Sequence, residues 1–394
     1  MNRQKFDIAI VGSSFAGMTC ALTLAQISPQ ISIALIEKEN IFDKVRGDDG
    51  RAYAISSSSL KLFKELGIYD ELQNVAGKIS DIKITDYKSP FVLDFIGLEV
   101  DDKDGQLGQI IENHFIFEAL KNKISQQKNI TIFCPNFYQE INFDDNVVIE
   151  LNDKKFIEAK LFLACDGRFS KLRELYEIPT QTKNYHQTAI VFKISHKIPH
   201  QNIAYEKFLP SGPLAILPLK DQNQSSIVWI ARDEEAQAIL GLDQENFLQQ
   251  LHKKMENCLG QCEIISSKFS YPLIMILAQD FYHQKMLLIG DSACGVHPIA
   301  GQGFNLAIVG IKNLRDLIAQ NILCGLEISS ESLIKSYHQK TRNNAKKMVI
   351  ATDVLNSIFE SKSLILKAGR NVGLGVINLL PKVKKFFIKN AGGF

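Results

Sequence analysis

The stretch 290–307 carries the side chains of this chain that are best suited to bind a ligand, and it reads GDSACGVHPIAGQGFNLA. The apolar residues 286–289 come directly before it and end abruptly at a Gly-Asp pair. A buried strand ends in this way where it delivers a carboxylate to the edge of a sheet. Asp291 is therefore expected to accept hydrogen bonds from the hydroxyl groups of a polyol.

The second half of the same stretch predicts a helix N-terminus that points at a flat, electron-rich group. Pro298 fixes its own φ and removes a backbone donor, which makes a rigid corner. Gly301-Gln302-Gly303 leaves backbone amides uncovered, and the apolar segment 304–311 is expected to be a helix whose dipole suits an anionic ring. For the Gly-Asp pair alone, a crossover with glycines for close packing is an equal alternative. The complete run favours a binding site.

A glycine-rich turn near the N-terminus predicts a second ligand-binding element. An apolar strand is expected over 6–11, GSSFAG occupies 12–17, and a helical segment continues to about Ile27. A second strand, 31–36, ends on Glu37. This is βαβ order with an acid about 25 positions after the first glycine, as a dinucleotide-binding fold requires.

Each position of this element has an expected task. Gly12 makes the tight turn, Gly17 lets the helix pack on the strand, and the amides of Ser14 to Ala16 can face a pyrophosphate. Glu37 suits the two hydroxyls of an adenosine ribose, which favours FAD or NAD over NADP. Ser14 stands where G-x-G-x-x-G has its middle glycine, and its Cβ would hold the backbone slightly farther from the phosphate.

The 290–307 stretch resembles the second FAD-binding motif of the flavin-dependent aromatic hydroxylases. The resemblance implies that Asp291 holds the ribitol of FAD and that 298–305 line the isoalloxazine ring. The chain departs from the family pattern at Cys294, where the family often has a histidine.

Three other positions match segments of the same family, and each keeps a second interpretation. Asp166 follows an expected strand over 156–164, where the resemblance implies contact with both FAD and the nicotinamide, although Asp-Gly is also a common turn. Arg51 matches a segment that lies along the FAD, and it is equally well explained as a solvated loop arginine. Asn113 matches a position near the flavin, and a plain helix N-cap explains it equally well.

The segment 204–229 narrows the resemblance to one branch of this family. AYEKF, GPLAILPL and the following Val-Trp pair are similar to the hydroxylases of ubiquinone biosynthesis, whose substrates are polyprenylphenols. Tyr271-Pro272-Leu273 and positions along the C-terminal region fall in the same register, so the resemblance covers essentially the whole chain.

The expected site binds FAD and needs no side chain as acid or base, because the cofactor carries the chemistry. His297 is a candidate for such a role, but a lone histidine beside a proline is more often structural. The residues expected to contact FAD are Gly12, Ser14, Ala16, Gly17, Glu37, Lys38, Arg51, Asn113, Asp166, Asp291, Pro298, Gly301, Gln302, Gly303, Phe304 and Asn305.

Composition excludes several classes of protein. The chain has 394 residues, 45% of them hydrophobic, and a net charge of +2, so no overall charge favours nucleic acid. Its seven cysteines include no C-x-x-C pair, which argues against a metal site or disulfide framework and favours a reducing compartment. No apolar run reaches the roughly 20 residues of a membrane span.

The expected fold is α/β: a doubly wound, Rossmann-like FAD-binding domain with an inserted β-sheet substrate domain and C-terminal helices, as in aromatic hydroxylases. The FAD-binding domain is expected to be discontinuous, because short strands interrupt the nucleotide-binding pattern. The expected domains are 1–78 plus 96–180 plus 270–330 for FAD, 79–95 plus 181–269 for the substrate, and 331–394 for the C-terminal helices.

The resemblance implies a monooxygenase that hydroxylates a polyprenylphenol with O2 through a flavin C4a-hydroperoxide. There is no second G-x-G-x-x-G, so NAD(P)H is expected as a transient co-substrate. Three alternatives stay open: a hydroxylase of a small soluble phenol, a flavin-dependent prenyl reductase or epoxidase, and a non-catalytic flavoprotein scaffold of a quinone-biosynthesis complex. A homo-oligomer is a further expected assembly.

The C-terminal residues 379–389 alternate apolar side chains with lysines. Such a basic amphipathic segment either docks as a helix on the core or contacts an anionic membrane surface. The expected location is therefore the cytoplasm, with peripheral contact at the inner face of the membrane as the alternative that a prenylated substrate favours.

Overall fold

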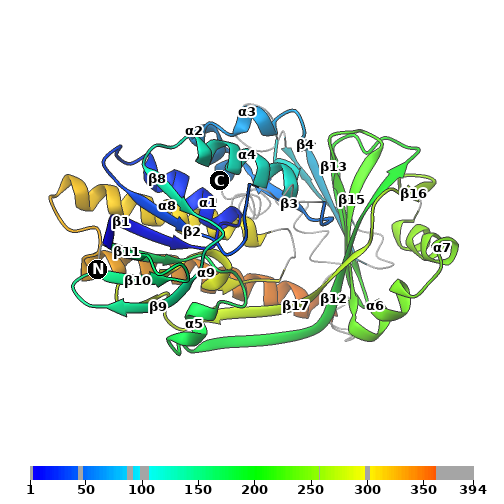
Figure 1. Cartoon of the computed structure of the whole chain (residues 1–394). Coiled ribbons are helices and arrows are strands. Elements are labelled where there is room, and N and C mark those ends of the chain that lie inside the picture. The colour runs from blue at the N-terminus through cyan, green and yellow to red at the C-terminus, as the bar shows by residue number, and fades with distance from the viewer. Residues whose placement is uncertain are drawn as a thin grey trace.

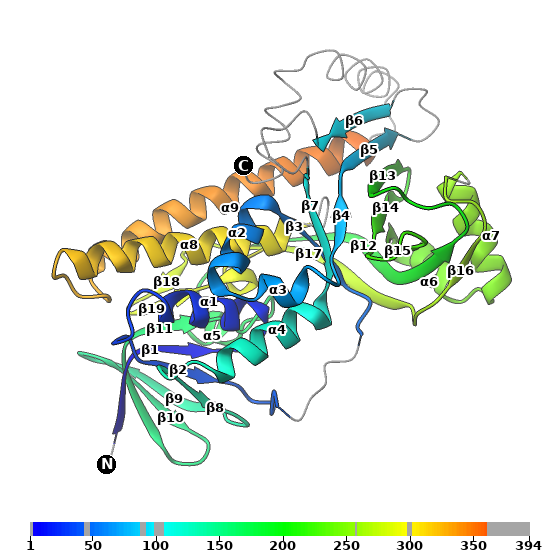
Figure 2. The ribbon, with the colours of Figure 1, turned by 90° about the horizontal axis from the view of Figure 1, so that it is seen from above.

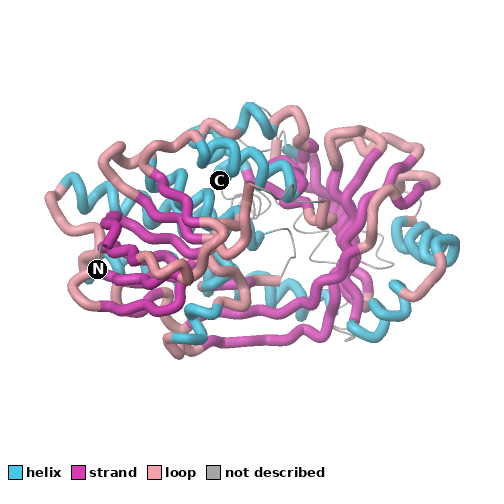
Figure 3. Tube along the Cα trace, viewed as in Figure 1, coloured by secondary structure: helices cyan, strands magenta, loops and turns pink. Residues whose placement is uncertain are grey.

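The computed structural model describes residues 3–42, 48–86, 92–97, 106–256, 258–297 and 302–360. The described chain forms two large sheets that lie next to each other, with helices packed on both (Figures 1 and 3). Two long strands of the second sheet, β12 (Thr180–His196) and β17 (Phe269–Ala278), extend to the side of the molecule where the first sheet lies (Figure 1).

The first sheet is built on five parallel strands in the order β19-β11-β1-β2-β8. Their apolar runs are continuous because helices cover the sheet, and helix α1 (Phe15–Ala25) packs against β1 and β2. The antiparallel strands β9, β10 and β18 complete this sheet. The bounds are β1 (Arg3–Val11), β2 (Ile33–Ile36), β8 (Ile130–Phe133), β9 (Tyr138–Phe143), β10 (Val147–Leu151), β11 (Phe156–Ala164), β18 (Tyr282–His283) and β19 (Met286–Leu288).

The second sheet has the order β20-β17-β12-β15-β14-β13-β5-β6, with β16 added on β12. One of its faces carries a core around Phe192, Trp229 and Phe247, which α6 and α7 cover (Figure 1). The other bounds are β5 (Asp81–Asp86), β6 (Val92–Ile96), β13 (Ile203–Leu209), β14 (Gly212–Pro218), β15 (Gln224–Arg232), β16 (Cys262–Ile264), β20 (Cys294–Gly295), α6 (Asp233–Leu240) and α7 (Gln244–Met255).

A small sheet of order β3-β7-β4 and the remaining helices complete the fold. Helices α8 and α9 lie side by side along the first sheet (Figure 2). No described helix combines the length and hydrophobicity that crossing a bilayer needs. The bounds are β3 (Ala52–Ser56), β4 (Gly77–Ile79), β7 (Gly108–Glu112), α2 (Ser57–Leu66), α3 (Tyr69–Leu72), α4 (Asn113–Ser125), α5 (Lys171–Leu175), η2 (Gly290–Ser292), α8 (Gln302–Leu323) and α9 (Glu331–Glu360).

The α/β fold class predicted from the sequence is confirmed. The domain bounds stay a prediction; β17 lies in the segment 270–330 that the sequence assigns to the FAD-binding domain, yet it pairs with β12 in the second sheet. The basic segment 379–389 lies outside the described residues.

Candidate functional site

The turn between β1 and α1 leaves no room for a side chain at its two glycines. Gly12 has a φ of +96°, and a Cβ built on it would lie 2.4 Å from the carbonyl oxygen of Cys165. A Cβ on Gly17 would lie 1.8 Å from the carbonyl oxygen of Gly12. Both distances are far below van der Waals contact. Glycine is therefore required both for the turn and for the close approach of α1.

The N-terminus of α1 offers backbone donors to a ligand. Ser14 is the N-cap residue, and its side chain makes no capping hydrogen bond. The amides of Ser14, Phe15 and Ala16 have no acceptor within the described chain. Unpaired amides at the positive end of a helix dipole suit a phosphate group.

Glu37 lies at the end of β2, beside this turn. Its Oε2 atom accepts hydrogen bonds from the backbone N–H of Ser13 at 2.7 Å and from the Ser13 hydroxyl at 2.9 Å. The structure thus brings the acid next to the helix N-terminus, where a ribose-binding carboxylate is expected. Lys38, the next residue, is exposed.

The loop after β11 brings Asp166 toward the same edge of the first sheet. Its Oδ2 atom accepts a hydrogen bond from the Leu172 backbone N–H at 3.1 Å. Its Oδ1 atom is buried and has no partner among the residues that the structure describes. A buried carboxylate oxygen without a partner is costly, so it marks a position where a ligand donor would be favourable.

Arg173 ties this loop to the 290–307 stretch. Its buried guanidinium donates to the carbonyl oxygens of Ser292 at 2.7 Å and of Arg168 at 2.8 Å. Ser170 fixes the start of α5, because its hydroxyl accepts from the Arg173 backbone N–H at 3.0 Å. Two segments far apart in sequence are therefore held as one unit at the edge of the sheet.

Asp291 stands on η2 and faces a positive charge. Its Oδ2 atom lies 3.4 Å from Nη2 of Arg168. Burial raises the pKa of the Asp291 carboxyl, and the charges of Arg168 and Arg51 oppose that rise. Gly290 has a φ of +67°, and a Cβ on it would lie 3.2 Å from the Ala16 Cβ. The turn therefore places Asp291 next to the N-terminus of α1.

Arg51 and Asn113 meet at a carboxylate that the sequence analysis did not single out. Arg51 Nε and Asn113 Nδ2 donate to the same Asp49 oxygen at 2.9 and 2.8 Å. The Tyr271 hydroxyl donates to the Asp49 carbonyl at 2.9 Å, and its ring lies below the Arg51 guanidinium. Arg51 is therefore not a freely solvated arginine, and Glu112 rather than Asn113 is the N-cap of α4.

Asn305 is buried and holds the start of α8 in place. Its Oδ1 atom accepts from the backbone N–H of Ser56 at 3.0 Å and from the hydroxyl of Ser59 at 2.8 Å. Its Nδ2 atom donates to the Ala54 carbonyl at 2.8 Å. These three bonds join α8 to the end of β3 and the start of α2, so the amide side chain is already engaged within the protein.

Phe304 also points into the protein. It is 3% exposed, stacks on Phe15 at 4.5 Å between ring centroids and contacts Tyr53 at 5.0 Å. Gln302 is buried as well, and a Cβ on Gly303 would have room, 3.7 Å from the Val296 side chain. At this helix N-terminus, chiefly backbone groups are therefore available to contact a flat ligand. Pro298 and Gly301 lie outside the described residues.

His297 links the 290–307 stretch to the second sheet. Its Nε2 atom lies 3.2 Å from Oε1 of Gln187 on β12, and its ring meets Tyr185 edge-on at 4.7 Å. Burial lowers the pKa of His297 to about 4, so the ring is neutral at ordinary pH. This environment agrees with the structural interpretation of His297.

Asp48, Glu112 and His114 form the one group within the described chain whose ligand atoms are close enough to hold a metal ion. Lys193 Nζ already forms ion pairs with Asp48 and with Glu112, each at 2.7 Å. An ammonium group therefore balances the two carboxylates, and the arrangement joins β12 to the nucleotide-binding side of the molecule.

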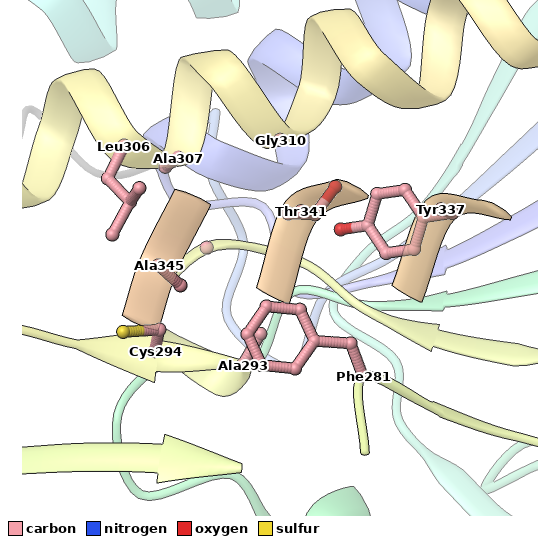
Figure 4. A pocket seen from close by; sticks show the side chains of 10 residues that line it. Phe281, Ala293, Cys294, Leu306, Ala307, Gly310, Tyr337, Thr341 and Ala345 are labelled. Atoms are coloured by element: carbon pink, nitrogen blue, oxygen red, sulfur yellow. The ribbon is translucent and has the colours of Figure 1, made fainter. Parts of the chain in front are cut away.

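A small cavity lies behind the 290–307 stretch, between η2 and the helices α8 and α9 (Figure 4). The Tyr337 hydroxyl, at one end of it, donates to the Leu288 carbonyl at 3.0 Å. The cavity measures about 10 Å³, which is room for one water at most. It is therefore a packing gap behind the motif and not a ligand pocket.

The structure adds three polar residues that the sequence analysis left out of the site: Ser13, Asp49 and Arg168. Each is a close sequence neighbour of a residue that was included. Their side-chain partners come from other elements, so only the folded chain identifies them.

Comparison with known proteins gives a consistent result. Residues 5–352 match the FAD binding domain family. The chain is 31% identical over 389 residues to ubiquinone hydroxylase UbiL of Rhodospirillum rubrum, covering 98% of this chain and 89% of that protein. It is 29% identical to ubiquinone hydroxylase UbiM of Neisseria meningitidis, covering 98% of this chain and 84% of the relative.

Solved structures with the same fold include p-nitrophenol 4-monooxygenase PnpA from Pseudomonas putida, with a TM-score of 0.80, 15% identity and 99% coverage of both chains. PqsL from Pseudomonas aeruginosa, a probable FAD-dependent monooxygenase, has a TM-score of 0.79 at 15% identity, covering 95% of this chain and all of that chain. At this level of identity the likeness concerns the fold.

Proposed function

The chain belongs to the FAD binding domain family, and we propose that it is an FAD-dependent monooxygenase that hydroxylates the ring of a polyprenylphenol in ubiquinone biosynthesis. NAD(P)H and O2 are its co-substrates. One observation carries the proposal: the similarity to a ubiquinone hydroxylase extends over 98% of the chain. It therefore includes the second sheet, where a substrate would be selected, as well as the nucleotide-binding sheet.

The residues at the edge of the first sheet fit FAD. The unpaired amides of Ser14 to Ala16 suit the pyrophosphate, and Glu37 suits the adenosine ribose. The orphaned Oδ1 of Asp166 and the carboxylate of Asp291 can accept hydrogen bonds from other cofactor hydroxyl or amide groups. FAD would supply the capacity to accept a hydride from NAD(P)H and to activate O2, and these residues would bind it, orient it and keep water away.

The assignment of individual FAD contacts remains our proposal. In it, some residues shape the site and others would contact the cofactor. Gly12 and Gly17 shape the turn, and Asn305 and Phe304 position the start of α8 through protein contacts. Arg51 and Asn113 converge on Asp49 and would contact the cofactor from the side of the small sheet.

The prenyl chain makes the substrate apolar, so the substrate is expected to reside in a membrane and to reach the protein from the membrane surface. We therefore place the protein in the cytoplasm with peripheral contact at the inner face of the membrane, where the lysine-rich segment 379–389 would meet anionic lipid. The protein would assemble with other ubiquinone-biosynthesis proteins or form a homo-oligomer. Either assembly would help an apolar intermediate to pass from one protein to the next.

The quinone lipids of cells that lack this gene test the proposal. Accumulation of one polyprenylphenol that is short of a single hydroxyl supports it and identifies the ring carbon. An unchanged ubiquinone profile in a cell without a second hydroxylase contradicts it, and activity on water-soluble phenols would then favour the small-phenol alternative. A scaffold would bind FAD and partners without substrate-stimulated NAD(P)H oxidation.

A further inference from the structure

Glu206 stands on the face of the second sheet that looks toward the nucleotide-binding side. Its neighbours on β13 point the other way: Tyr205 packs in the core under α7, and Lys207 forms an ion pair with Glu256 at 2.7 Å beyond that helix. Side chains alternate along a strand, so Glu206 belongs to the opposite face.

Contacts of other strands identify that opposite face. Lys193 on β12 reaches Asp48 and Glu112, and Gln187 on the same strand reaches His297. These side chains share one face because they lie at even spacing along β12. The face that carries Glu206 therefore looks at the elements that we assign to FAD.

The pairing register places Glu206 in one row across the sheet. Val191 pairs with Val228, Val228 with Ala215, Ala215 with Glu206, and Glu206 with Ile84. A Cβ built on Gly50 would lie 3.3 Å from the carbonyl oxygen of Val191, so the nucleotide-binding side touches this row. Glu206 lies three strands from Val191 along this row, which corresponds to a distance of about 14 Å between the two residues.

This row is apolar and only partly covered. Ile84, Ala215 and Val228 are all half-buried, whereas Leu214, Ile216 and Trp229 on the other face are fully buried. Glu206 is itself half-buried, and it has no hydrogen-bond or ion-pair partner among the described residues. A single unpaired carboxyl group in an accessible apolar row suits an apolar molecule that carries one hydroxyl donor.

We propose that Glu206 binds the phenolic hydroxyl of the substrate and accepts its proton, so that the ring is presented as a phenolate. This role rests on the proposed function. The phenol O–H bond breaks, its electron pair stays on the phenol oxygen, and the proton forms an O–H bond with the Glu206 carboxylate. The negative charge moves from the carboxylate to the ring, where it favours attack by an electrophilic oxygen. The proton returns to the product oxygen before release.

The environment of Glu206 suits this transfer. Burial raises the pKa of Glu206 to about 7. A free phenol has a pKa of about 10, so the raised pKa of Glu206 reduces the difference between the pKa values of the phenol and the carboxyl group. Glu206 must be ionised to accept the proton, and its preference for a phenol should therefore increase as the pH rises through about 7. Among the described residues, the charged groups on or facing this side include Asp86, Lys193, Asp48, Asp49, Glu112 and Arg51.

Binding to the FAD-loaded enzyme tests this role with two probes, 2-prenylphenol and its methyl ether. Their dissociation constants are measured from the change in flavin absorbance at about pH 6 and about pH 8.5. We expect the wild-type enzyme to prefer the phenol about tenfold at the higher pH and less at the lower pH. Glu206→Leu should bind both probes equally at either pH. Glu206→Gln, which keeps the size and a hydrogen bond, should keep a small preference that does not change with pH.

Glu256→Gln is the matched control, because it removes a carboxylate at the end of α7 that pairs with Lys207 on the other face of the sheet, and it should behave as the wild type does. The proposal is overturned if Glu206→Gln keeps the pH-dependent preference of a wild-type enzyme that hydroxylates the phenol. A wild-type enzyme that binds neither probe contradicts the proposed function itself, and the role of Glu206 with it.

Discussion

The position of Asp291 in the folded structure agrees with the position that the sequence predicts. The sequence places it at the end of an apolar strand, and the structure places it beside Arg168 and against the N-terminus of α1. Arg168 favours the ionised carboxylate in a site where burial disfavours charge. The pair thus keeps a hydrogen-bond acceptor available for a cofactor hydroxyl.

Asp291→Ala is expected to lose most of its FAD. A hydrogen bond between an ionised carboxylate and a hydroxyl contributes about 1.5–3 kcal/mol, which corresponds to roughly ten- to a hundredfold in the dissociation constant. The flavin content of the protein after gel filtration measures this effect. Asp316→Ala, which removes an exposed acid on α8, is the control and should keep its flavin. Full flavin content in Asp291→Ala would contradict the assignment of Asp291 as a residue that binds FAD.

His297 predicts a pH dependence of stability. The folded protein holds this ring neutral down to a pKa of about 4, whereas the unfolded chain binds a proton near pH 6.5. The unfolded state therefore binds more protons as the pH falls below 6.5, and the contribution of His297 to stability is lost between there and pH 4. Between about pH 7 and pH 5 the loss amounts to about 2 kcal/mol.

Denaturant unfolding of the wild type and of His297→Gln at these two pH values isolates this contribution, since the other titrating groups are common to both. The variant should lose less stability on acidification. An equal loss in the two proteins would show that His297 is not the responsible group.

At the scale of elements, the glycine contacts decide how α1 sits on the first sheet. Gly17→Ala forces a Cβ to within 1.8 Å of a backbone oxygen, so α1 must move. We expect a loss of about 3 kcal/mol in the free energy of unfolding, together with weaker FAD binding. Gly325→Ala is the control, because no atom lies within 4 Å of a Cβ built there; its φ of +69° alone should make the substitution cost about 1 kcal/mol. Similar denaturation midpoints for the two variants would contradict this packing.

The elements were largely predictable from the sequence, whereas the directions of their side chains were not. Apolar runs and the GSSFAG turn were sufficient for β1, α1 and the strand before Asp291. The resemblance pointed to 298–305 as the lining of the ring, yet Phe304 and Asn305 face the core around Phe15 and Ser56. Which face of a helix is buried depends on its tertiary partners, and those come from segments about 250 residues away in sequence.

At the scale of the whole molecule, the two sheets are held together around the expected FAD site. Lys193 and Gln187, both on β12 of the second sheet, reach across to the nucleotide-binding side. A cofactor bound there would contact several elements of the folded chain at once, whereas the unfolded chain has no such site.

Removal of FAD should therefore lower the thermal stability of the whole protein. At a hundredfold excess of FAD over its dissociation constant, binding adds about 2.7 kcal/mol. For a chain of this size that corresponds to a rise of several degrees in Tm. Calorimetry of the apoprotein with increasing FAD measures the shift, and a Tm that does not respond to FAD would contradict an FAD site in this fold.

The measurement that tests the central claim most directly is the mass of the product formed by the FAD-loaded protein from a short-chain polyprenylphenol, NAD(P)H and ¹⁸O2. We predict a hydroxylated phenol that carries one atom of ¹⁸O on the ring. A product without the label, or NAD(P)H oxidation that the prenylphenol does not stimulate, would contradict the assignment of this protein as a polyprenylphenol hydroxylase.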